Sequence, residues 1–265
     1  MSVSTLLSRA ILAFAVASLA AVALAGSASA REDERDVPRL VSFGGACANC
    51  ALSGRKLVGA RFMGANFSGA QLVGSDLRGA SFVGSTFAGA DLTRADLRGA
   101  SMTGANFMLA NFTDAAMAGL EAHAARFMHA NLTRADLQST EMPGADLTYV
   151  DGRGAKFAHA EMAGANLAGG RFDRASFVDA EMTGANLTGS GFSGADFKGA
   201  ELTGATLTGA DLAEARNLTQ AELEGACADG ATRLPAGLSV RRCRGGPPRP
   251  PSPPKPPASP APPAR

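Results

Sequence analysis

The sequence has no tryptophan and one tyrosine, and it holds only three histidines and four cysteines among 265 residues. Its formal net charge is +1, so it lacks the basic surface that nucleic-acid binding needs. No nucleophile elbow, metal-ligand cluster, phosphate loop or dinucleotide fingerprint is present, and the histidines lie apart at His123, His129 and His159. These absences predict a protein that is not an enzyme and that carries neither a cofactor nor a metal.

A period of five residues runs without interruption from Leu52 to Leu212. Every fifth position holds Leu, Phe or Met, except at Ala122 and Gly152, and the residue two places before is in most units a small one, usually Ala. A period of five residues matches neither the 3.6 residues per turn of an α-helix nor the two-residue alternation of a flat strand. The chain must therefore turn a corner every five residues, so that all large side chains face one interior, which is a solenoid.

The repeated unit combines small, polar and large residues in a fixed order. Ala105, Asn106 and Phe107 place a small inward residue, a polar outward one and a large inward one in sequence. Gly is common two places after the large residue, as at Gly184, where it relieves the crowded corner. Over roughly residues 50–214 the chain resembles the pentapeptide repeat family, whose unit is written A(D/N)LxG. The resemblance implies an all-β fold, a right-handed quadrilateral β-helix with four five-residue faces in each coil.

Four faces make a coil of twenty residues, so side chains twenty apart should stack. Like residues recur at this spacing and would form ladders between coils: Phe67, Phe87, Phe107 and Phe127, followed by Leu147, Leu167, Leu187 and Leu207. The two exceptions are compensated, because Leu120 precedes Ala122 and Val150 precedes Gly152 at the small positions, which conserves interior volume. About eight coils would make a filled column on the order of 40 Å long, without a cofactor cavity.

The N-terminus predicts export. Arg9 precedes an apolar run from Ala10 to Leu24, and Ala28 to Ala30 form a small-x-small cleavage site, so the mature protein should begin near Arg31. The run is short for a membrane span, although an uncleaved anchor is the alternative reading. No twin-arginine pair and no lipoprotein cysteine accompany it. We expect a periplasmic or secreted protein that does not span a membrane after cleavage.

The four cysteines, Cys47, Cys50, Cys227 and Cys243, lie at or beyond the ends of the solenoid. Cys47 and Cys50 suit a redox pair, half of a zinc site or a disulfide, whereas Ala51 in place of His excludes covalent haem attachment. A redox pair would need a βαβ context, and a zinc site would need two more nearby ligands. In an oxidising compartment, structural disulfides are favoured. Pairing within each end is simplest, but the sequence leaves the connectivity open.

The five-residue period ends after Ala215. A cap is needed there, because the last coil of a solenoid exposes unpaired strand edges and apolar core. Thr219 to Glu222 form a capping-box pattern that predicts a short helix, with Leu223 and Ala226 on its apolar face. The segment from Leu218 to Leu238 also resembles one that follows many proteobacterial pentapeptide arrays.

From Gly245 the composition shifts to proline, with Arg249, Lys255 and Arg265 interspersed. Such a tail cannot build a core and is expected to be extended, polyproline-II-like and disordered. It is either an inert extension or a cationic tether for anionic envelope polymers or for a partner. The expected organisation is a signal peptide at 1–30, an N-terminal linker or cap at 31–49, the β-helix at 50–216, a C-terminal cap at 217–244 and the proline-rich tail at 245–265.

One outward column is acidic. It consists of Glu121, Glu141, Glu161, Glu181 and Glu201, which are twenty residues apart and should stack on one face. Like charges on neighbouring strands repel unless a counter-ion or partner compensates them. This glutamate column is either a relic of tandem duplication or a ladder that attracts a divalent cation such as calcium, or a basic partner.

Some cytoplasmic members of the resembled family act as rod-shaped mimics of duplex DNA that bind DNA gyrase. That role needs a strongly acidic surface, whereas residues 52–214 hold 17 acidic and 13 basic residues, a net charge of −4. Together with the signal peptide, this argues against gyrase and nucleic-acid partners. The sequence predicts an exported, non-enzymatic scaffold or protein-interaction rod whose partner is a protein or an envelope component, and it leaves homodimer formation open. The alternative is a binding module for divalent cations or envelope polymers, through the glutamate column or the tail.

Overall fold

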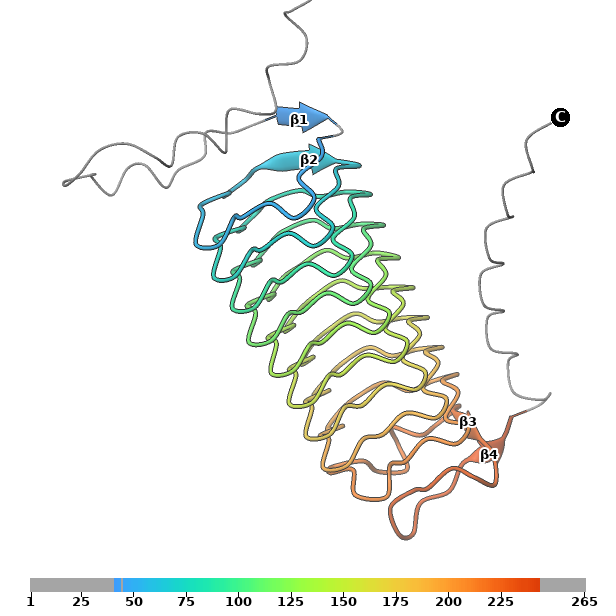
Figure 1. Ribbon diagram of the computed structural model, residues 1–265. Helices are drawn as coiled ribbons and strands as arrows, with labels where there is room; N and C mark the ends of the chain where they lie inside the picture. Colours follow the sequence, from blue (N-terminus) through green and yellow to red (C-terminus); the bar gives the residue numbers. More distant parts are fainter. Residues whose placement is uncertain (1–40, 44, 244–265) are drawn as a thin grey trace, which may run out of the picture. The chain divides into compact units, whose positions relative to one another are not determined.

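The computed structural model describes residues 41–43 and 45–243. The predicted signal peptide at 1–30, residues 31–40 of the predicted linker, and the proline-rich tail lie outside these residues. The described residues contain four short strands: β1 (Val41–Phe43), β2 (Arg61–Met63), β3 (Cys227–Ala228) and β4 (Arg241–Arg242). β1 pairs with β2 and β3 pairs with β4, both in parallel (Figure 1).

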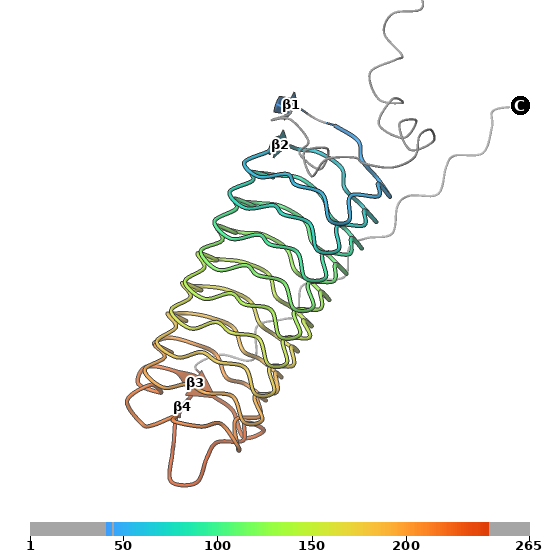
Figure 2. The same cartoon turned by 90° about the vertical axis from the view of Figure 1, so that its left-hand side faces the viewer.

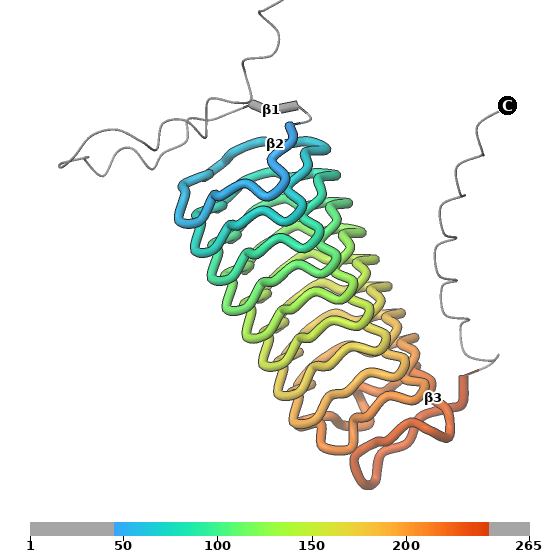
Figure 3. The backbone as a smooth tube through the Cα atoms, viewed as in Figure 1, coloured from blue at the N-terminus to red at the C-terminus, as the bar shows by residue number. Residues whose placement is uncertain are grey.

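Between β2 and β3 the chain forms coils that stack on one another (Figures 1 and 2). Every fifth residue makes a parallel bridge to the residue twenty positions later, as Ala51 does to Gln71. Four bridges per coil divide the surface into four rows. We number them by their first residues: row 1 starts at Ala51, row 2 at Lys56, row 3 at Arg61 and row 4 at Ala46. The twenty-residue stacking predicted from the sequence is confirmed, and the tube in Figure 3 follows it coil by coil.

The backbone amides explain why the unit has five residues and favours Asp or Asn. In the unit 90–94, two amides donate to the following coil, one donates to the preceding coil and one closes the corner turn. The remaining amide, that of Thr93, donates to Oδ1 of Asp91 at 3.0 Å. Asn106 accepts from the amide of Met108 at 3.1 Å in the same way. Because buried backbone groups must be paired, Asp or Asn before the large residue completes the set in the units that contain it.

The large residues of the period form the core. Phe107 and Leu167 have no exposed surface, whereas Asn106 and Asn166 lie partly exposed on the outside. Phenyl rings twenty residues apart stack with centroid separations of 4.8 Å, 5.1 Å and 5.0 Å along the predicted ladder from Phe67 to Phe127. Each such burial contributes roughly 1.5–3 kcal/mol. The inward assignment and the stacked phenylalanine ladder are confirmed.

The two exceptions to the period are also buried. Leu120, Ala122 and Val150 are at most 1% exposed, so large and small residues have exchanged places as expected. At Gly152 the neighbouring coil also contributes, because an added side chain would meet the Phe172 ring at 2.6 Å. The core therefore stays filled through both irregular coils.

The corners require the left-handed backbone conformation. Gly184, for example, has a φ of +66°, and the other corner positions have similar values. Glycine adopts this conformation without steric cost, which accounts for its frequency two places after each large residue.

The predicted helix after the last coil is not formed. Thr219 and Glu222 do make the capping-box contact, in which the amide of Thr219 donates to the Glu222 carboxylate at 2.8 Å. Residues 220–225, however, form turns whose backbone bonds span three residues, and Gly225 ends them with a φ of +77°. So short a segment gains too few hydrogen bonds to offset the cost of starting a helix.

The cap nevertheless covers the last coil. Leu218, Leu223 and Ala226 are 8%, 2% and 1% exposed and belong to the continuous core. The apolar pair predicted at Leu223 and Ala226 is therefore buried as expected, although turns rather than a helix present it.

We predict that Phe107→Asp lowers the free energy of unfolding by more than the roughly 3–5 kcal/mol typical of emptying a buried Phe site, because it also buries an unpaired charge. Asn106→Asp is the matched control, since it adds the same charge one residue away on the outside. Thermal and urea melting of both variants test this. An unchanged melting temperature for Phe107→Asp would show that the inward assignment is wrong.

Candidate functional site

The glutamate column lies on row 3. Four successive bridges join its members: Glu121 to Glu141, Glu141 to Glu161, Glu161 to Glu181, and Glu181 to Glu201. All five side chains are exposed. Among the described residues, Glu141 is the one member with an ion-pair partner, His123, at 3.2 Å between Nε2 and Oε2. The predicted stacking of these residues is therefore present, and it produces a line of negative charge along one row.

Metal binding has less geometric support. Within the described ranges, no group of three or more His, Cys, Asp or Glu side chains is arranged to hold a metal ion. Each coil contributes one carboxylate to the column, so neighbouring members come from different coils. The column is thus arranged as a linear array of single carboxylates.

Two disulfides close the ends of the solenoid. Cys47 pairs with Cys50, and Cys227 pairs with Cys243, which are the two pairings within each end. Cys47 and Cys50 occupy the large and small inward positions of the first coil, so their bond replaces an apolar pair of the repeat. The second bond spans 16 residues, a loop for which a disulfide contributes about 3 kcal/mol.

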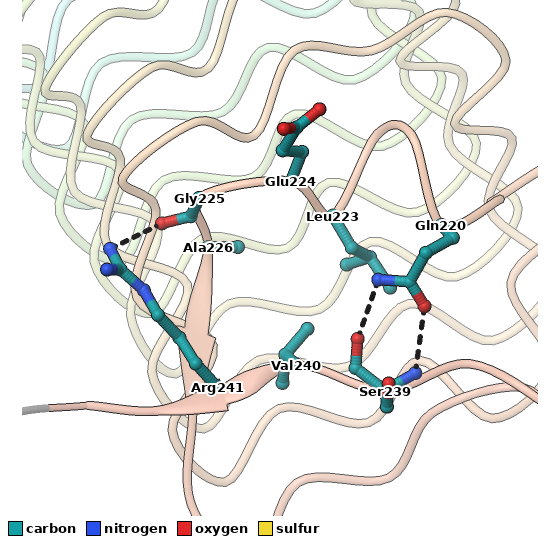
Figure 4. Close-up of a pocket in the computed structure, with 8 residues that line it drawn as sticks. All are labelled: Gln220, Leu223, Glu224, Gly225, Ala226, Ser239, Val240 and Arg241. Carbon is teal, nitrogen blue, oxygen red and sulfur yellow. Dashed lines mark hydrogen bonds between the residues drawn. The ribbon is translucent and has the colours of Figure 1, made fainter.

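An open pocket lies in the C-terminal cap (Figure 4). Gln220 donates to the Ser239 carbonyl at 2.9 Å and accepts from the Ser239 amide at 3.2 Å. The Arg241 guanidinium donates to the Gly225 carbonyl at 2.8 Å. These polar groups bind one another across the pocket, so their evident role is to hold β4 against the turns.

Charged pairs on rows 1 and 2 repeat one local pattern. Asp76 and Arg78 are two residues apart on the same outward face, and Arg78 donates to both carboxylate oxygens at 2.8 Å and 2.7 Å. Asp96 and Asp151 have the same arrangement with Arg98 and Arg153. The period of two along an extended unit places both side chains outward, so this spacing could have predicted the pairs.

These arginines lower the carboxyl pKa values. The side-chain hydrogen bond from Arg78 is the main cause that holds the pKa of Asp76 below its usual range, and Arg98 acts in the same way on the pKa of Asp96. A carboxyl whose pKa is depressed by folding adds stability above its unfolded pKa of about 4. That stability is lost as the pH falls through the lower folded pKa. Because the pairs lie at the surface, each contribution is small.

A cluster that the sequence analysis did not single out lies at the corner that follows row 4. Leu109, His129 and Tyr149 occupy this corner in three successive coils, with φ values of 61°, 57° and 56°, where neighbouring coils have Gly89 and Gly169. The His129 and Tyr149 rings stack with centroids 5.0 Å apart. The corner cluster consists of these three residues and two adjacent methionines, Met108 and Met128. Inspection of the corner positions alone would have found it, because three large residues replace the usual glycine there.

The family model for pentapeptide repeats matches residues 47–84, 75–114, 125–160, 153–189 and 190–232. The chain belongs to the pentapeptide repeat family. A comparison with curated proteins found no match. Within the described residues of this pentapeptide repeat protein, no helix is long and apolar enough to cross a membrane.

Solved structures of other pentapeptide repeat proteins are similar. HetL, described as involved in the regulation of heterocyst differentiation in the cyanobacterium Nostoc, is 25% identical with a TM-score of 0.56, over 70% of this chain and 91% of HetL. Trypsin-treated QnrB1, a plasmid-mediated fluoroquinolone resistance protein, is 21% identical with a TM-score of 0.40, over 71% of this chain and 91% of its own. A protein of the Arabidopsis thaliana thylakoid lumen is 30% identical with a TM-score of 0.18, over 50% of this chain and 68% of its own. The likeness to HetL supports a solenoid of the same kind.

We predict that Glu161→Gln/Glu181→Gln stabilises the pentapeptide solenoid at low ionic strength by roughly 1 kcal/mol, because it removes like-charge neighbours along row 3. The gain should shrink as salt is added, since the side chains are exposed. Ser81→Gln/Ser101→Gln is the control, because it changes the same row without changing charge. Urea unfolding at several salt concentrations measures the effect. A gain that does not depend on salt would contradict the electrostatic explanation.

Proposed function

We propose that this pentapeptide repeat protein is exported and acts as a non-enzymatic scaffold, a rigid rod to which another protein or an envelope component binds. The observation that carries the proposal is the continuous core, in which the inward positions are buried from Phe67 to Leu212. Side chains fill the interior, so a partner can meet only the outer rows. The right-handed quadrilateral coil implied by the family resemblance is part of this proposal.

The repeat suits such a role because it separates stability from recognition. Inward residues and backbone bonds hold the coils, whereas outward positions vary from coil to coil. On row 1, for example, the outward residue is Asn111, Asn131, Asp151 and then Arg171 in successive coils. HetL is described as involved in the regulation of heterocyst differentiation. The structural likeness to HetL supports a regulatory or interaction function here.

A row-by-row substitution scan tests the scaffold. Affinity capture of the full-length protein from the envelope fraction of its source cells should retain a discrete partner, which is then purified for titration. Two outward residues on one row at a time are changed to Lys: Thr113 and Thr133 on row 1, Ala118 and Gln138 on row 2, Ala163 and Thr183 on row 3, Ala168 and Thr188 on row 4. For the row that contacts the partner, we expect the affinity to fall at least about tenfold, which corresponds to a loss of about 1.4 kcal/mol of binding free energy.

The other three rows serve as matched controls, and thermal melting shows that each variant is folded. Equal affinity for all four variants would contradict partner binding on the rod. Recovery of glycans alone, without a protein, would favour the alternative function.

Export makes a separate prediction. The protein isolated from the envelope should begin at Arg31 and should contain no free thiols, because both disulfides form in an oxidising compartment. Intact mass and thiol titration under denaturing conditions measure both properties. A mature protein that still begins at Met1 would contradict cleavage of a signal peptide. Four reactive thiols would exclude the disulfides and return the zinc and redox readings of Cys47 and Cys50 to consideration.

The second candidate function is a binding module for divalent cations or envelope polymers. The observation that favours it is the row of stacked carboxylates, in which Glu141 alone among the described members has an ion-pair partner. A ligand that binds only the folded rod must raise its melting temperature. Melting with calcium at constant ionic strength tests this candidate, and an equal shift in Glu161→Gln/Glu181→Gln would exclude the column as the site.

A further inference from the structure

The corner cluster is costly to the fold, which makes its presence informative. A non-glycine residue in the left-handed region costs roughly 1–2 kcal/mol, and neither Leu nor Tyr has a short polar side chain that eases the strain. Leu109 and Tyr149 nevertheless adopt this conformation, although glycine occupies the same corner in the coil before the cluster (Gly89) and in the coil after it (Gly169). Ten other non-glycine residues adopt this conformation, Arg94 and Arg134 among them, so what sets the cluster apart is the large apolar side chains that Leu109 and Tyr149 place at an exposed corner.

The cluster is also exposed. Leu109 is 64% exposed, Tyr149 is 56% exposed and Met108 is 39% exposed. They are three of the five large apolar side chains that are exposed within the described part of the chain. A contiguous exposed apolar patch favours a docking function, whereas a single exposed residue does not.

The rings of the cluster are arranged in advance. The Tyr149 ring lies over Gly169, because a side chain added at Gly169 would collide with it. His129 stacks on the Tyr149 ring at an interplanar angle of 11°. The result is a ring pair fixed against the coils, flanked by Leu109 and Met108. Aromatic surfaces of this kind bind proline-rich segments, which are already extended and lose little entropy on docking.

The chain carries its own proline-rich segment, and that segment begins on the same row. Row 4 continues through the bridge from Thr206 to Cys227, and β3 then pairs with β4. The disulfide to Cys227 fixes Cys243, whose sulfur lies 3.7 Å from Oγ1 of Thr208, next to the corner residue Gly209. The described part of the chain therefore ends, at Cys243, on the row whose corner bears the cluster, and residues 244–265 follow that point in the sequence.

The proline-rich segment is long enough to reach the cluster. Five coils separate Thr208 from Met108, a distance of about 24 Å at a strand spacing of about 4.8 Å. Eight residues of polyproline II cover this distance, at about 3.1 Å each. The prolines start at Pro247, and 11 of the 14 in the sequence lie within 244–265. The first half of the tail is thus within reach of the whole cluster.

We propose that the corner cluster is the docking site for this chain's own proline-rich segment, Pro247–Pro257, which folds back along row 4. Prolines lie on the Tyr149 and His129 rings and on Leu109. The docked segment covers one side of the solenoid. The inference goes beyond the scaffold function and depends on neither export nor an external partner.

The full-length protein contains a reporter, because Tyr149 is its one tyrosine and tryptophan is absent. Acrylamide quenching of tyrosine fluorescence measures access to the ring. Substituting Pro247, Pro248, Pro250 and Pro251 by Ser should increase the quenching constant about twofold, as expected for loss of a site that is mostly occupied. The matched control changes the distal prolines Pro260, Pro262 and Pro263 to Ser and should leave it unchanged.

Proton NMR contacts identify the occupant. In the unaltered protein, the Tyr149 ring protons should show cross-peaks to proline Hδ protons. These cross-peaks should be lost in Leu109→Gly/His129→Gly, which restores the usual corner residue and should fold at least as stably. Absence of the cross-peaks, or equal quenching in the proximal and distal variants, would overturn the proposal. Cross-peaks found only between molecules in a mixed labelled and unlabelled sample would assign the site to a second copy and would also overturn it.

Discussion

Pairing of backbone amides between successive coils is the constraint on which the structure depends. In a regular unit two amides donate to the following coil, one donates to the preceding coil and one closes the corner turn, and where Asp or Asn is present its side chain accepts from the last, as Asp91 does from Thr93. A slip of one residue would leave these groups unpaired in every coil that follows, which is costly inside a protein. The five-residue register is therefore kept from the first coil to the cap, even where the core residues change.

The same register explains why inward and outward positions of the solenoid differ in the residues that they accept. Inside, Ala122 and Gly152 are accepted because Leu120, Val150 and Phe172 fill the space that they leave. Outside, a residue meets mainly its neighbours above and below, so charged pairs, glutamates or rings accumulate along rows. Features such as the glutamate column and the corner cluster cross several coils for this reason. A partner would recognise a row, and its contacts would repeat at the coil spacing.

The ends follow different chemistry, because the repeat cannot terminate itself. The first coil replaces an inward apolar pair with the bond between Cys47 and Cys50. At the other end, Leu218 and Leu223 cover the core, and β4 is tied to β3 by the bond between Cys227 and Cys243. These covalent links limit fraying where a coil has neighbours on one side only.

The sequence alone determined the architecture of the solenoid, because a strict period of five allows only one inward face. Phe107 inside, Asn106 outside and the stacking of Glu141 on Glu161 follow from it directly. The cap was only partly predictable. Its buried Leu223 and its capping-box contact were expected, but local pattern could not tell a helix from turns over six residues. The disulfide pairing was decided by tertiary structure, since the distance between Cys227 and Cys243, like that between Thr208 and Cys243, depends on how the last coil closes. Periodicity identifies which residues share a row, and only the folded chain shows which neighbours that row acquires at its end.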